Sequence, residues 1–428
     1  MNRQFFGHVR APGRGLRVLV ALCLVMGVLA TSGCSSVDRW KILDGSTAAL
    51  ADDVVMAVYV SHQSSDSSMS GYVLLVDSHG GVSAVRTSGM DLAQLVWDEQ
   101  GLFFSDTDKD YLLTGQGLDT WASSKTDVQV AAFSKPGGGH VSVYNLGFGD
   151  SARDLGQADE GGEDLGYIEQ VVDSGDGGSS RYDVAGFSSV TALCGSSVFS
   201  VSEVGDPYVS LAQAMGASQR TSAPVWPDML TQIYPKPLSL EEGLKSVDQD
   251  SIGDYALRGS VCRDGSILTI SANPMKNTNA ALSVVTWPTD GRPRVAQPIV
   301  GPDGKALPVG SEIVSGTSVA EWSPDSDHLV WIGGDGVVRS TELSHGTTTT
   351  LWDSGAERIR SPYTTFAFSG STVYVLDPVG AWAPDMQMRL RSHDLVTGET
   401  REVLTVKLGF ERVDKGLCLR GIAIRPAG

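Results

Sequence analysis

The chain has 428 residues, of which 41% are apolar, and its 32 Lys and Arg against 50 Asp and Glu give a formal net charge of −18. This apolar content is sufficient for a packed core of one large or two smaller domains and excludes a disordered chain. A surface this acidic repels phosphate backbones, so no nucleic-acid partner is expected.

The first 33 residues have the pattern of an export signal. They contain four arginines and no acid, and they include the thirteen-residue apolar run Val18–Ala30. That run is too short to span a bilayer comfortably, but it fits the core of a signal peptide. No later stretch approaches eighteen consecutive apolar residues. Residues 1–33 are therefore predicted to be a signal peptide.

The residues after the apolar run predict a lipid anchor. The tetrapeptide Thr31-Ser32-Gly33-Cys34 resembles the lipobox of bacterial lipoproteins, in which small residues precede the cysteine that is lipidated. The resemblance implies lipidation of Cys34 and attachment to a cell membrane, facing outside the cytoplasm. The alternative is an ordinary signal peptide cut nearby, with Cys34 incidental. Residues 34–52 have mixed polarity and are predicted to be a tether.

The stretch from Gly316 to Asp353 predicts one blade of a β-propeller. It consists of four short apolar or alternating runs separated by Ser-Pro-Asp, Gly-Gly-Asp-Gly and a glycine turn. Strands this short cannot bury both faces alone, so each sheet needs neighbours stacked on either side.

Looser copies of this unit recur along the chain. In each copy an apolar run, a turn and a second apolar run follow one another, and the first runs end near positions 97, 133, 194, 262, 322 and 368. Their spacings are those of propeller blades lengthened by insertions. An all-β propeller over residues 53–428 is therefore predicted.

A seventh copy is divided between the two ends of the chain. Gly421–Pro426 has the pattern of a first strand with nothing after it, whereas Val54–Arg86 has the later strands of a blade without a first one. Pairing the two would close the ring and remove two exposed edges. Seven blades are predicted, with six or eight as alternatives.

Two rim insertions are expected, at about 150–183 and 207–250. The first is rich in glycine and acid and lacks a strand pattern apart from Tyr167–Val172. The second contains five prolines and two helical patterns, Tyr208–Met215 and Ser239–Val247. Loops on a rigid propeller carry its contacts, so both insertions are candidate contact regions.

Three cysteines remain outside the leader and the lipidation site, namely Cys194, Cys262 and Cys418. At most one intramolecular disulfide can form among them, and the sequence does not select the pair. No Cys-x-x-Cys motif supports a zinc or redox site.

One acidic triplet is a candidate cation site. Asp106, Asp108 and Asp110 have the alternate spacing with which a calcium loop begins. However, Tyr111 replaces the expected glycine and Gly117 the terminal glutamate, so the triplet is not an EF-hand. The alternative is a solvated hairpin turn. No other cofactor is indicated.

Catalytic motifs are weak throughout. The chain has no G-x-S-x-G elbow, and the neighbouring Asp77, Ser78 and His79 read as a turn. Glycosidase chemistry needs two facing carboxylates, and none of the 50 acids is singled out as a pair. These observations favour a protein that is not an enzyme.

Two of the nine tryptophans are candidate contact residues. Trp226 and Trp382 each lie close to proline in a predicted loop, where an aromatic ring can contact a sugar or a protein. The default reading of Trp97, Trp322, Trp331 and Trp352 is core between blades.

Trp322-Ser323-Pro324-Asp325 followed by Leu329–Ile332, with the later turn Asp394–Glu399, resembles the WD40-like repeats of TolB-type propellers. The resemblance implies the propeller fold and protein–protein interaction in the cell envelope, and it transfers no catalytic residue. We therefore expect a membrane-anchored binding or scaffold protein whose rim loops contact envelope proteins. The alternative is a propeller that binds or cleaves envelope glycan at a central channel.

Overall fold

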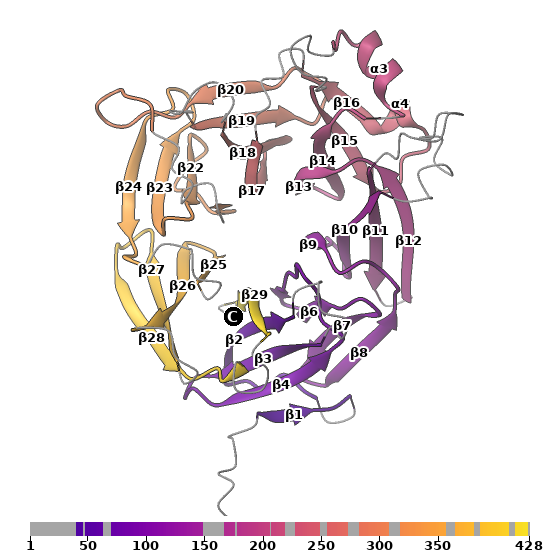
Figure 1. The fold of residues 1–428 in the computed structure, drawn as a ribbon. Helices are drawn as coiled ribbons and strands as arrows, with labels where there is room; N and C mark the ends of the chain where they lie inside the picture. The colour runs from indigo at the N-terminus through magenta and orange to yellow at the C-terminus, as the bar shows by residue number, and fades with distance from the viewer. Residues whose placement is uncertain are drawn as a thin grey trace, which may run out of the picture. The chain divides into compact units, whose positions relative to one another are not determined.

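The computed structural model describes residues 40–426, with gaps at 46–47, 63–69, 149–166, 176–177, 206, 219–226, 249–254, 273–281, 308–316, 357–363 and 381–385, and at 411–415. The compact unit that holds all described residues begins at Trp40. It is an all-β propeller of seven sheets arranged around a central axis (Figure 1).

Six of the described sheets have four antiparallel strands that follow one another in sequence. The strands of three of these sheets are β5 (Val96–Asp98), β6 (Gly101–Ser105), β7 (Lys109–Thr114) and β8 (Gly117–Ala122); β9 (Gln129–Ser134), β10 (His140–Phe148), β11 (Tyr167–Gly175) and β12 (Gly178–Ala185); and β13 (Ser188–Cys194), β14 (Ser197–Glu203), β15 (Asp228–Tyr234) and β16 (Leu244–Val247).

The other three have the same order. Their strands are β17 (Tyr255–Arg263), β18 (Ser266–Ala272), β19 (Leu282–Pro288) and β20 (Val295–Pro298); β21 (Ser318–Val319), β22 (His328–Ile332), β23 (Val337–Glu342) and β24 (Thr348–Asp353); and β25 (Thr365–Ser369), β26 (Thr372–Val379), β27 (Gln387–Asp394) and β28 (Thr400–Val406). The six blade starts expected from the sequence are confirmed, because each expected run overlaps or directly follows the first strand of a sheet.

The remaining sheet closes the ring with strands from both ends of the chain. Its order is β1 (Lys41–Leu43), β4 (Val82–Thr87), β3 (Gly71–Asp77), β2 (Val54–Ser61) and β29 (Cys418–Ile424). β29 pairs antiparallel with β2, from Met56 opposite Ile424 to Ser61 opposite Cys418. The predicted closure and the count of seven blades are confirmed.

The segment expected to be a tether is partly folded. β1 pairs in parallel with the outer edge of β4, and the Trp40 Nε1–H donates to the Leu408 carbonyl at 2.6 Å. Ala48 and Leu50 are buried. The sequence missed this because β1 has only three residues, too few for an alternating pattern. The folded unit thus extends back to Trp40.

The expected insertions are also partly sheet. β11 and most of β12 fall within 150–183, and β15 and β16 fall within 207–250. β12 was missed because its sequence, GSSRYDVA, has few apolar residues and its strand is largely accessible. The helix α3 (Val209–Ala214) confirms the first helical pattern, whereas α4 (Leu240–Gly243) is a single turn that leads into β16.

The core lies between the blades. One cluster joins Ile270 of β18 to Trp331 of β22, and another joins Val330 of β22 to Val375 of β26. Inner strands such as β2 are buried on both faces, whereas the outer strand β28 is mostly exposed. Each sheet therefore hides its faces against its neighbours, which is why the strands read as short apolar runs. Among the described helices, none is long and apolar enough to cross a membrane.

The innermost strands run in the same direction. Asp98 and Ser134, which end β5 and β9, are hydrogen bonded, and Cys194 and Cys262, near the ends of β13 and β17, are joined by a disulfide. The connections from first to second strands therefore gather at one end of the axis. We call this end the hairpin face and define it by residues 99–100, 135–139, 195–196, 264–265, 320–327 and 370–371.

Candidate functional site

The acidic triplet is built into the protein's own hydrogen bonds. Asp106 accepts from the backbone N–H groups of Ser88, Asp108 and Lys109, each at 2.8 Å, and from the Tyr111 hydroxyl at 2.6 Å. Asp108 accepts from the Ser88 hydroxyl at 2.8 Å. Asp106 thus shapes the turn between β6 and β7. No group of three ligating side chains that could hold a metal occurs within the described ranges.

Asp110 forms a fully buried ion pair. Its Oδ1 lies 2.9 Å from the Lys125 Nζ, and both side chains have 0% exposure. The hydroxyls of Ser105 and Ser174 also donate to this carboxylate, at 2.8 and 2.6 Å. Burial lowers the pKa of Lys125, while Asp110 opposes that shift. The Asp110 carboxylate of β7 thus links the second blade to the third through the hydroxyl of Ser174, which belongs to β11.

Three other sequence-predicted site residues, Cys34, Trp226 and Trp382, lie outside the described residues. By sequence, Trp226 falls between β14 and β15 and Trp382 between β26 and β27, so both belong to connections from a second to a third strand. The core reading of the other tryptophans holds. Trp331 is fully buried, and Trp97, Trp322 and Trp352 pack half-buried against the clusters between blades.

Three described recesses lie at the hairpin face. The largest, of about 840 Å³, is lined by both hairpins of the second blade and by Leu50, Trp97, Arg425 and Pro426. A second, of about 370 Å³, is lined by Lys135, three glycines and the hairpin from β11 to β12. A third, of about 440 Å³, lies between β21 and β25. Volumes above about 300 Å³ are in the range of small-ligand sites.

In the largest recess an arginine already covers the tryptophan. The Arg425 Cζ lies 5.8 Å from the centre of the Trp97 ring. Arg425 also donates to the carbonyls of Ala51 and Asp52 at 2.8 and 2.7 Å. The guanidinium thereby holds the N-terminal segment against the end of the closing strand. Glu99 and Gln116 of the same recess are exposed.

The Asp98 carboxylate of this recess is unsuited to donate a proton. Burial alone would raise its pKa, but the His140 ring 3.5 Å away and hydrogen bonds from the Ser134 hydroxyl and the Gln100 N–H lower the pKa to about 2. Asp98 is therefore ionised at neutral pH. A glycosidase needs a carboxylic acid that stays protonated beside its substrate. Glu169 has a pKa raised to about 7 by burial, yet it is 1% exposed, is held by Ser188 and lies in none of the three recesses.

The recess between β21 and β25 combines aromatic and acidic side chains. Trp322 and Phe368 line it together with Val319, Glu321 and Gly370. Trp322 and Phe368 are half-buried, and Glu321 is exposed. Among the described residues of the lining, Glu321 is the one carboxyl group. These residues therefore offer a negative charge beside two rings and no pair of acids for hydrolysis.

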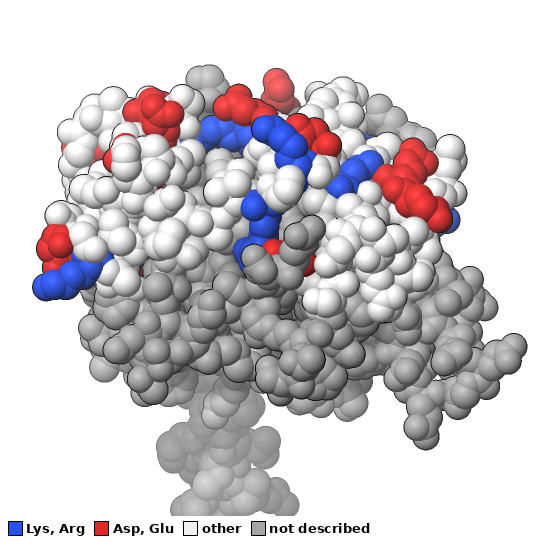
Figure 2. Space-filling view, turned by 90° about the horizontal axis from the view of Figure 1, so that it is seen from above, with Lys and Arg blue, Asp and Glu red and all other residues white. Residues whose placement is uncertain are grey.

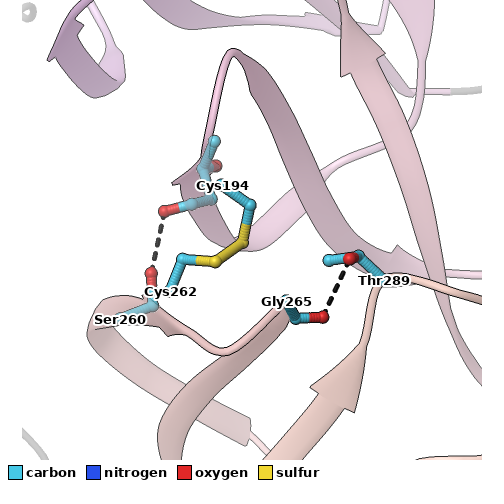
Figure 3. The surroundings of a disulfide bond; sticks show 6 residues. Cys194, Ser260, Cys262, Gly265 and Thr289 are labelled. Atoms are coloured by element: carbon cyan, nitrogen blue, oxygen red, sulfur yellow. Dashed lines mark hydrogen bonds between the residues drawn. A yellow bond between two sulfur atoms is a disulfide. The ribbon is translucent and has the colours of Figure 1, made fainter.

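A disulfide crosslinks two blades at the same face. Cys194 and Cys262 are joined, with their Cα atoms 5.2 Å apart (Figure 3). Nearby, the Ser260 hydroxyl donates to the Thr191 carbonyl at 2.9 Å, and the Thr289 hydroxyl donates to the Gly265 carbonyl at 2.8 Å. The pairing that the sequence left open is thus Cys194 with Cys262, and Cys418 is a free thiol.

Charge on the described surface is mixed in sign. Figure 2 shows acidic and basic side chains interspersed, with wide uncharged areas between them. Exposed charges of opposite sign also form pairs among the described residues, such as Asp290 with Arg292 and Asp303 with Lys305. No large basic area that would bind nucleic acid is seen in this view of the described residues.

The sequence did not predict the recesses, although it did predict that the aromatic residues lining two of them occupy equivalent positions in their blades. Positions 97, 322 and 368 were predicted to be equivalent ends of first strands, and Trp97 and Trp322 were predicted to lie in the core between blades. One signal was available, because in two of these copies an acid lies beside the tryptophan, as Asp98-Glu99 after Trp97 and as Glu321 before Trp322. An acid next to the end of an inner strand is accessible at the axis, and so is the edge of its aromatic neighbour.

One comparison with known proteins supports the propeller fold. The family described as YycP, beta-propeller domain, matches residues 49–154, which span β2 to β10. This part of the chain is similar to a known propeller family. No curated protein matches the sequence.

Several solved structures are distantly similar. They include apo AztD from Citrobacter koseri, with 12% identity over 86% of this chain and 97% of that chain and a TM-score of 0.38. BamB from Moraxella catarrhalis has 10% identity over 86% and 87%, with a TM-score of 0.41. The computationally designed Ika8 has 14% identity over 72% and 85%, with a TM-score of 0.35. These values are too low to support any inference about a ligand or partner.

Proposed function

We propose that the protein is a lipid-anchored β-propeller that binds a partner protein outside the cytoplasm of a bacterial cell. The observation that carries the proposal is the disulfide between Cys194 and Cys262. Disulfides persist in oxidising compartments and are rare in the cytosol. The disulfide therefore supports export on grounds independent of the leader over residues 1–33 and the lipobox-like Cys34.

The hairpin face supports binding rather than hydrolysis. The described lining of the recess between β21 and β25 combines two rings with one carboxylate, and Asp98 in the largest recess is held in its ionised form. Connections on a rigid propeller can vary while the blades stay fixed, so they are suited to carry contacts. Trp226 and Trp382 stay predicted contact residues on the other set of connections.

Glycan binding without cleavage is a second candidate. The largest recess places Trp97 beside Glu99 and Gln116. An aromatic ring with nearby hydrogen-bonding side chains is the usual composition of a site that takes a polar ligand with apolar faces. The Arg425 guanidinium lies over the Trp97 ring and leaves less of its face available to stack on a sugar. Binding of a partner protein is therefore proposed ahead of glycan binding.

The test is photocrosslinking in intact cells with p-benzoylphenylalanine. The crosslinker replaces Glu99 or Glu321 on the hairpin face, and in the matched control it replaces Leu351, which is 39% exposed on the outer strand β24. We expect a discrete protein adduct from the two hairpin-face positions and none from the control. The adduct is identified by mass spectrometry.

The same strains test the anchor. In a Cys34→Ser variant we expect loss of radiolabelled palmitate incorporation and loss of the protein, with its adduct, from the membrane fraction. Palmitate labelling that survives the substitution would refute the anchor. Absence of any protein adduct, together with binding of the purified full chain to a glycan array, would reverse the order of the two candidates.

A further inference from the structure

Four described tryptophans share one arrangement, in which an arginine lies over the ring and is paired with a carboxylate. The Arg Cζ atoms lie 5.0 to 5.8 Å from the ring centres. The sets are Trp287 with Arg294 and Asp248, Trp331 with Arg339 and Asp335, Trp352 with Arg391 and Asp377, and Trp97 with Arg425 and Asp52.

The arrangement has a simple physical basis. The face of an indole ring carries partial negative charge and attracts a cation within about 6 Å. A carboxylate adds a charge-assisted hydrogen bond in the plane of the guanidinium, which is the geometry that arginine provides and lysine does not. In the sixth blade, for example, the Arg339 Nη1 donates to the Asp335 Oδ1 at 3.0 Å while its Cζ lies 5.0 Å from the Trp331 ring.

The recess at Trp322 contains an indole ring and a carboxylate, as the four sets do, but it lacks the arginine among its described residues. It brings together the Trp322 ring, the Phe368 ring and the Glu321 carboxylate in about 440 Å³. Within the part of the chain that the structure describes, Trp322 has no cation over its ring and Glu321 has no ion pair. Glu321 is exposed and the recess is open to solvent.

We propose that this recess binds an arginine side chain from a basic segment of the partner protein. The inference rests on the proposed docking function and names the chemistry of the partner. Charge complementarity supports it, because the chain carries a net charge of −18 and the same connection also bears the exposed acids Asp325 and Asp327. The guest guanidinium lies between the two rings and pairs with Glu321.

The test uses ¹⁹F NMR on the full chain, purified in detergent and labelled with 5-fluorotryptophan. The probe is an acetylated, amidated peptide with two arginines separated by one glycine. The matched control peptide carries citrulline, the neutral isostere of arginine, at both positions. The Trp322 signal is assigned by its disappearance in a Trp322→Phe variant.

We expect the arginine peptide to shift the Trp322 signal saturably and the citrulline peptide to leave it in place. Glu321→Gln should weaken the binding about threefold, because it removes one carboxylate of a partly exposed ion pair. Glu402→Gln removes an equal charge from the exposed outer strand β28, away from the hairpin face, and should leave the binding unchanged. Raising the salt concentration should weaken it further.

Two results would overturn the inference. One is an equal response to the citrulline peptide, and the other is a Trp322 signal that neither peptide moves. Failure here is distinguishable from failure of the proposed function. If in-cell adducts still form at Glu99 and Glu321, docking stands and only the arginine chemistry is wrong.

Discussion

Replacing Lys125 by methionine is expected to lower the free energy of unfolding by about 3–5 kcal/mol. The ammonium group lies 2.9 Å from the Asp110 carboxylate, and neither side chain is exposed. Without it, Asp110 is a buried charge whose remaining donors are the hydroxyls of Ser105 and Ser174, with the Ser179 hydroxyl farther away at 3.5 Å. The measurement is urea denaturation of the full chain, followed by tryptophan fluorescence.

Two variants test the cause of this loss. In the Lys125→Met background, Asp110→Asn removes the stranded charge, so we expect the double variant to regain part of the stability. Lys305→Met breaks an ion pair whose side chains are 83% and 59% exposed, and it should cost at most about 1 kcal/mol. A Lys125→Met loss no larger than that of Lys305→Met would contradict the buried ion pair.

Removing the disulfide is expected to cost about 4 kcal/mol. The chain-entropy account gives a value of this size for a loop that joins residues 68 apart in sequence. The variant replaces both Cys194 and Cys262 with serine, and thermal unfolding is recorded with and without dithiothreitol. Reduction should destabilise the natural chain and leave the variant unchanged.

The free thiol provides the control for this measurement. Cys418→Ser removes a half-buried cysteine that forms no disulfide, and we expect a change within about 0.5 kcal/mol. Equal unfolding of the natural chain with and without dithiothreitol would show that Cys194 and Cys262 are not joined. It would also remove the main support for an oxidising compartment.

The architecture could be predicted because each blade leaves its own pattern in the sequence. Short apolar strands that must pack against neighbouring sheets recur along the chain, and the incomplete copies at residues 54–86 and 421–426 predict that the two ends pair to close the ring. The outer strands were harder to predict, because a strand such as β12 is largely accessible and has few apolar residues. The disulfide pairing depends on which blades are neighbours at the axis, which spacing alone does not fix.

The candidate site was less predictable than the fold. Trp97 and Arg425 are brought together only when the ring closes. Trp322 and Phe368 meet because first strands of adjacent blades end side by side. Conversely, the acidic triplet at residue 106 has an attractive spacing, but its carboxylates are used for a turn and a buried ion pair. Long-range contacts decide these roles.

Closure of the ring by the last strand is tested most directly by a single substitution, Ser61→Cys. Ser61 lies opposite the free Cys418 in the pairing of β2 with β29. Opposed residues in antiparallel strands have Cα atoms about 4.5–5.5 Å apart, within the range for a disulfide.

After mild oxidation, mass spectrometry of the digested full chain should identify a peptide linking positions 61 and 418. Thr341→Cys, at a buried position in the sixth blade, should give no link to Cys418. A folded Ser61→Cys chain without the link, or a link from position 341, would contradict the closed seven-bladed ring.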